Sequence, residues 1–114
     1  MSETEKIQDL KDPPHSQLVA LRDRMLVDEW DDDLTPAQQT TAAMQLVNIQ
    51  GAIRRLRKAQ LAEIGAKLAA NEDDLRKARR EIADKAQGLR ATAAALDTIA
   101  GFLAVVGRVV TLVA

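Results

Sequence analysis

The sequence predicts an all-α protein made of a short amphipathic helix followed by a long antiparallel, coiled-coil-like helical hairpin that is apolar at its open end. The main observation is an aliphatic residue at every seventh position, because such a repeat keeps one stripe of a helix turned towards a partner helix. The repeat consists of Leu61, Leu68, Leu75, Ile82, Leu89, Leu96, Leu103 and Val110. Composition agrees: hydrophobic residues make up 46% of the chain but Trp30 and Phe102 are its only aromatics, which favours helix packing over strands.

A length of 114 residues predicts one domain. We expect residues 1–12 to be a flexible acidic N-terminus and residues 13–114 to form a single helical domain. Asp12-Pro13-Pro14 predicts a helix start, since a carboxylate caps the first turn and proline is tolerated there. The apolar spacing then predicts an amphipathic helix over about residues 14–30. The carboxylates around its end are unfavourable at a helix C-terminus and should stop it.

The second helix has a clear start at Thr35-Pro36, with Gln38 placed for a capping box. We expect helices over about residues 36–70 and 72–113, with the chain reversing at Asn71, because Asn71 is a good cap and three carboxylates follow it. In this antiparallel hairpin Leu46 would lie near Leu96. One continuous helix is the alternative, because the heptad repeat crosses Asn71 and neither glycine nor proline marks a bend.

Residues 98–114 are apolar on nearly all sides and would overhang the other arm of the hairpin. We expect this end to bind a second copy or a partner protein by helix packing. The candidate partner-binding residues are Leu96, Ile99, Phe102, Leu103, Val106, Val110 and Val113. Burial inside the protein's own bundle and insertion into a membrane are the alternatives, although seventeen helical residues span only about 25 Å of a hydrocarbon layer of about 30 Å.

Charge is distributed unevenly along the chain. Residues 1–33 carry ten acidic and four basic side chains, a balance of −6, and residues 34–114 carry seven and twelve, a balance of +5. The acidic part is expected to dock on the basic part of the same molecule or of a neighbour; alternatively it shields a basic surface from an anionic partner. The candidate anion-binding residues are Arg54, Arg55, Arg57, Lys58, Arg76, Lys77, Arg79 and Arg80. An internally paired, solvated face is the competing interpretation.

No arrangement of residues predicts an enzyme, a cofactor, a metal or a small-molecule substrate. The chain has no Cys, and its single histidine, His15, has no second ligand beside it. The acidic cluster at residues 28–33 lacks the glycine and distal glutamate of a calcium-binding loop.

The sequence therefore predicts a non-enzymatic interaction or oligomerisation module that forms a homo-oligomer or binds a partner protein. A polar N-terminus unlike a signal peptide favours the cytoplasm. One alternative is a small membrane-active or membrane-anchored accessory protein of the phage or secretion type that uses residues 98–114. Nucleic-acid binding through the basic residues is a further and disfavoured alternative, because aromatics for base stacking are scarce.

Overall fold

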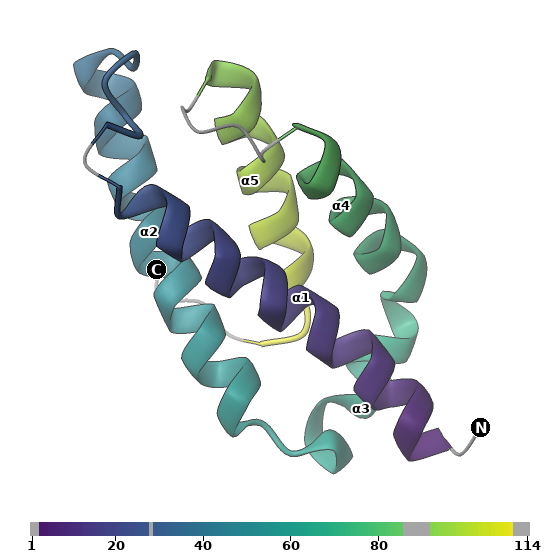
Figure 1. Ribbon diagram of the computed structural model, residues 1–114. Coiled ribbons are helices and arrows are strands. Elements are labelled where there is room, and N and C mark those ends of the chain that lie inside the picture. The colour runs from purple at the N-terminus through teal and green to yellow at the C-terminus, as the bar shows by residue number, and fades with distance from the viewer. Residues whose placement is uncertain (1–2, 28, 86–91, 111–114) are drawn as a thin grey trace.

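The computed structural model describes residues 3–27, 29–85 and 92–110, and these are helical with no strand, which confirms the predicted all-α class. The helices are α1 (Glu3–Met25), α2 (Pro36–Lys58), α3 (Leu61–Ala70), α4 (Glu72–Lys85) and α5 (Ala93–Val106). Figure 1 shows α1, α2, α4 and α5 as a bundle, with the short α3 joining α2 to α4 at one end. The longest dimension is 46 Å, against about 118 Å for one continuous helix over residues 36–114. The continuous-helix alternative is therefore wrong.

Helix α1 begins at Glu3 instead of near residue 14, so the expected flexible N-terminus is helical from that point, and it ends at Met25 instead of near residue 30. Pro13 and Pro14 lie inside this helix, where proline removes a hydrogen bond and crowds the preceding turn. Packing outweighs that cost: Leu10, Pro14 and Leu18 lie on one face of α1 and are all buried. Burial of a continuous apolar face stabilises a helix that local preference alone would have interrupted.

The predicted cap of α2 is confirmed, because the Gln38 backbone N–H donates to Thr35 Oγ1 at 3.2 Å and the Thr35 N–H donates to Gln38 Oε1 at 2.9 Å. The helix then stops at Lys58, well short of the expected residue 70. Ala59 and Gln60 are extended, with ψ angles of 135° and 141°. The carbonyl oxygen of Ala59 accepts a hydrogen bond from Lys11 Nζ of α1 at 3.0 Å. A side chain from another helix thus satisfies a backbone acceptor at the break.

The predicted helix boundary at Asn71 is confirmed, but the expected helix over residues 72–113 is divided. Helix α4 ends at Lys85, and α5 begins after Thr92, whose Oγ1 accepts from the Ala95 N–H at 3.0 Å. Helices α4 and α5 lie side by side, and Arg108 Nη1 contacts Asp74 Oδ2 at 2.7 Å. Since Arg108 follows α5 and Asp74 begins α4, these two helices are antiparallel.

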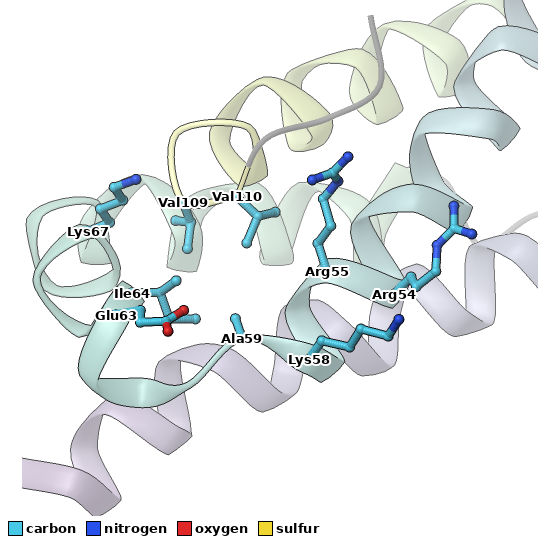
Figure 2. A pocket seen from close by; sticks show the side chains of 9 residues that line it. All are labelled: Arg54, Arg55, Lys58, Ala59, Glu63, Ile64, Lys67, Val109 and Val110. Carbon is cyan, nitrogen blue, oxygen red and sulfur yellow. The ribbon is translucent and has the colours of Figure 1, made fainter.

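A second reversal of the chain therefore makes α5 parallel to α2, where the sequence predicted an antiparallel pair. Near the N-terminal half of both helices, Gln45 Nε2 donates to the Leu96 carbonyl oxygen at 2.9 Å, so residue 45 does lie beside residue 96. At the other end, Val110 and Ala59 line the same hollow (Figure 2). The C-terminal end of α5 is thus next to the C-terminal end of α2. The sequence had instead predicted that it would extend past the N-terminal end of α2.

We expect Phe102→Ala to lower the free energy of unfolding by about 3–5 kcal/mol, because it would leave a cavity in a core where Phe102 is only 1% exposed. Urea denaturation followed by circular dichroism measures the change. Met44, which is 63% exposed, provides the control: Met44→Ala should change stability by no more than about 0.5 kcal/mol. Equal effects of the two substitutions would contradict the assignment of α5 to the core.

Two helical glycines form a second test. A Cβ added at Gly101 would meet no atom within 4 Å, whereas one at Gly65 would lie 2.9 Å from Ile7 Cδ1 of α1. We expect Gly101→Ala to stabilise the protein by about 0.5–1 kcal/mol, since alanine favours a helix interior. Gly65→Ala should give a smaller gain or none, because the end of the Ile7 side chain must move. Thermal denaturation of both variants would show the difference.

Candidate functional site

The candidate partner-binding stripe of α5 lies inside the bundle. Every member that the structure describes is buried: Leu96, Ile99, Phe102, Leu103, Val106 and Val110. Val113 lies outside the described residues. Helices α2 and α4 both pack against α5, and together they cover the broad apolar face that the sequence expected to be open. No helix among the described residues is both long enough and apolar enough to cross a membrane.

The candidate anion-binding residues are divided between two hollows, because α4 packs against α1 and α5 and not along α2. Arg54, Arg55 and Lys58 line a pocket of about 560 Å³. Arg76, Arg79 and Arg80 line a separate hollow of about 310 Å³ beside α1. Two further members are exposed and line neither hollow: Arg57 and Lys77. The single basic patch expected from the sequence is therefore two clusters.

The larger hollow, called the basic pocket below, lies between the end of α2, α3 and the turn that follows α5. It is lined by Arg54, Arg55, Lys58, Ala59, Glu63, Ile64, Lys67, Val109 and Val110. Figure 2 shows Val109 and Val110 pointing from the turn towards Ala59 and Ile64, so the inner wall is apolar. The charged side chains of this pocket are exposed. The pocket thus has an apolar wall and a charged rim.

The rim carries four cationic groups and one carboxylate, Glu63, a net charge of +3. None of these five side chains forms an ion pair or a side-chain hydrogen bond with any residue that the structure describes. Two arginines outside the pocket have carboxylate partners: Arg22 contacts Asp23, and Arg76 contacts Glu72 at 3.3 Å. The basic pocket thus brings four cations without ion-pair partners around one hollow.

The break at Ala59 and Gln60 creates this pocket. Arg54, Arg55 and Lys58 occupy the end of α2, where positive charge interacts favourably with the helix dipole. The extended residues then turn α3 away, which brings Lys67 and Ile64 to the opposite side of the hollow. Sequence reasoning missed Glu63, Lys67 and the pocket role of Val109, because neither glycine nor proline marks the break.

The second hollow is a weaker candidate. Gln17 Nε2 of α1 donates to the Arg79 carbonyl oxygen at 3.0 Å, which joins α1 to α4. Gln17 Oε1 and Arg79 Nε are buried without a hydrogen-bond partner. However, Arg76 already has Glu72 as a partner, so less of the charge here is free for a ligand than at the basic pocket.

His15 and the acidic side chains are the remaining groups that the sequence singled out. His15 is half-buried, and its Nε2 has no hydrogen-bond partner. Within residues 3–27, 29–85 and 92–110, no group of three His, Asp or Glu side chains could hold a metal ion. No family model, curated protein or solved structure matches this chain. The function must therefore be argued from the basic pocket itself.

Unpaired like charges in the basic pocket should cost stability. We expect Arg55→Gln to raise the free energy of unfolding by a few tenths of a kcal/mol at low ionic strength, and the gain should disappear in about 1 M salt, which screens the repulsion. Arg76→Gln is the matched control and should lower stability by a similar amount, since it removes the partner of Glu72. Chemical denaturation at two salt concentrations shows whether each substitution raises or lowers the free energy of unfolding. A loss of stability in Arg55→Gln at low ionic strength would mean that the favourable interaction of Arg55 with the dipole of α2 exceeds the repulsion from the other cations.

Proposed function

We propose that the protein is a non-enzymatic helical interaction module that binds an acidic and partly apolar segment of a partner protein at the basic pocket. The observation that carries this proposal is the set of four unpaired cations around an apolar wall. The binding surface differs from the one that the sequence suggested, because the stripe of α5 is buried in the core.

The chemistry of the pocket favours a peptide segment. Guanidinium groups such as those of Arg54 and Arg55 bind carboxylates through paired hydrogen bonds. Ile64, Val109 and Val110 form an apolar wall, but only 6%, 2% and 8% of their surfaces are exposed, so this wall offers a small contact for one aliphatic side chain of the partner. An apolar centre with a polar rim is the usual anatomy of a protein interface. Nucleic acid fits less well, because the pocket has no aromatic side chain on which a base could stack.

Binding at one pocket should be weak. A volume of about 560 Å³ accommodates only a few side chains, and the contact would bury far less than the roughly 1,600 Å² of a standard stable interface. We therefore expect a dissociation constant of the order of 10–100 µM, which is typical of transient recognition. The affinity should fall as salt is added, because exposed charges are screened.

Charge reversal in the pocket tests the proposal. A fluorescently labelled peptide with two leucines flanked by Asp and Glu residues should bind the wild-type protein in a fluorescence anisotropy titration. The Arg55→Glu/Lys58→Glu variant should bind it at least about tenfold more weakly, since two attractive contacts become repulsive. A peptide with serine in place of both leucines should also bind more weakly, because the apolar wall loses its contact.

The matched control is Arg57→Glu/Lys77→Glu, which changes the net charge equally at exposed residues outside both hollows. This variant should bind the peptide like the wild-type protein. If both double variants lost binding equally, the peptide would be attracted by overall charge, and the basic pocket would not be its site.

A further inference from the structure

We propose that the segment bound at the basic pocket belongs to a second copy of this chain. The segment is the acidic turn, defined as Leu26, Val27, Glu29, Asp31, Asp32 and Asp33 between α1 and α2. This inference rests on the proposed function and gives the partner a chemical identity. Two observations support it: the turn presents the kind of surface that the pocket would bind, and it cannot reach the pocket of its own molecule.

The acidic turn presents carboxylates next to aliphatic side chains. Leu26 and Val27 are 57% and 50% exposed, and Glu29 and Asp32 are exposed as well. Large exposed aliphatic residues beside carboxylates match both the apolar wall and the cationic rim of the basic pocket. Neither Glu29 nor Asp32 forms a side-chain ion pair with a described residue. Both carboxylates are therefore available to the cations of a neighbour.

Backbone hydrogen bonds and two buried side chains attach the described residues of the acidic turn to the bundle. The backbone of the turn is closed by hydrogen bonds from the Trp30 N–H to the Val27 carbonyl oxygen at 3.0 Å and from the Leu34 N–H to the Asp31 carbonyl oxygen at 3.0 Å. Trp30 and Leu34 are buried in the core and attach the turn to the bundle. A segment that is already ordered loses less conformational entropy on binding.

Docking within one molecule is excluded by the length of α2. The acidic turn precedes the first residue of this helix, and the basic pocket lies at its last turn. Pro36 and Lys58 are separated by about 33 Å at the helical rise. Figure 1 shows the turn and α3 at opposite ends of the bundle. Most of the acidic part of the sequence belongs to α1, which packs against α2, α3 and α4 of its own molecule. The acidic turn alone cannot reach its own basic pocket, so only the pocket of a neighbour is within its reach.

The resulting contact is head to tail. Each copy would place its acidic turn in the basic pocket of the next copy, and its own basic pocket would receive the acidic turn of a third copy. Such a heterologous contact produces open chains or rings instead of a closed two-fold dimer. The small contact area makes the association weak. Average mass should therefore rise with protein concentration and should fall as salt is added.

Sedimentation velocity of the full chain tests this arrangement. In low salt the wild-type protein should show an average mass that rises with concentration, and in about 0.5 M salt it should remain monomeric. The pocket variant Arg55→Glu/Lys58→Glu and the turn variant Glu29→Lys/Asp32→Lys should each remain monomeric in low salt. The controls Arg57→Glu/Lys77→Glu and Asp9→Lys/Asp84→Lys change exposed residues elsewhere by the same charge, and both should associate like the wild-type protein.

Mixing the two monomeric variants gives the decisive measurement. In the mixture the pocket variant supplies an unchanged acidic turn and the turn variant supplies an unchanged basic pocket, so a one-to-one complex should form in low salt. A mixture that stays monomeric, or a turn variant that still associates, would overturn the inference. Circular dichroism and thermal unfolding of each variant would show that a lost association is not a loss of folding.

The two proposals can fail separately. If the acidic test peptide binds the pocket while the wild-type protein is monomeric at every concentration, self-association is wrong and the partner is another protein. If the pocket variant also leaves peptide binding unchanged, the proposed function is wrong as well.

Discussion

Burial of the apolar face of α5 is the constraint on which the remaining structure depends. Ile99, Phe102 and Val106 need cover on more than one side, and a two-helix seam would leave part of this face in water. The chain supplies that cover by reversing again after α4, so that α4 and α2 both contact α5. The parallel direction of α2 and α5 follows from this second reversal. The same geometry places the turn after α5 against the end of α2, where it forms the apolar wall of the basic pocket.

Local signals in the sequence predicted the helices well wherever a cap or a repeat was decisive. Thr35 with Gln38 gave the start of α2, and Asn71 gave the boundary between α3 and α4. The start of α1 was missed because Pro13 and Pro14 suggest that a helix begins there. The burial of Leu10 instead favours a helix that begins before the prolines. The break after Lys58 was missed because no glycine or proline marks it, and the hydrogen bond from Lys11 to Ala59, 48 positions away in the sequence, forms only in the folded bundle. A heptad repeat shows that the apolar stripe of a helix packs against another helix, but it does not show which helix that is.

The candidate site was also predictable only in part, because it too depends on contacts between residues that are far apart in the sequence. Arg54, Arg55 and Lys58 stand out as a charged run at the end of a helix, whereas Lys67 and Val109 join them only through the break and the direction of α5. Counting charges gave an excess of basic residues in the later part of the chain. It did not show that Arg76 and Arg108 have carboxylate partners while the cations of the basic pocket have none. Pairing between side chains is a property of the folded bundle.

The placement of Trp30 has an optical consequence. It is the only tryptophan in a chain without tyrosine, and it is 4% exposed within the loop that joins α1 to α2. Intrinsic emission excited in the tryptophan absorption band therefore comes from a single indole at one end of the molecule. Its wavelength and intensity report on the local polarity there, so the protein carries a label-free fluorophore whose signal has only one structural origin.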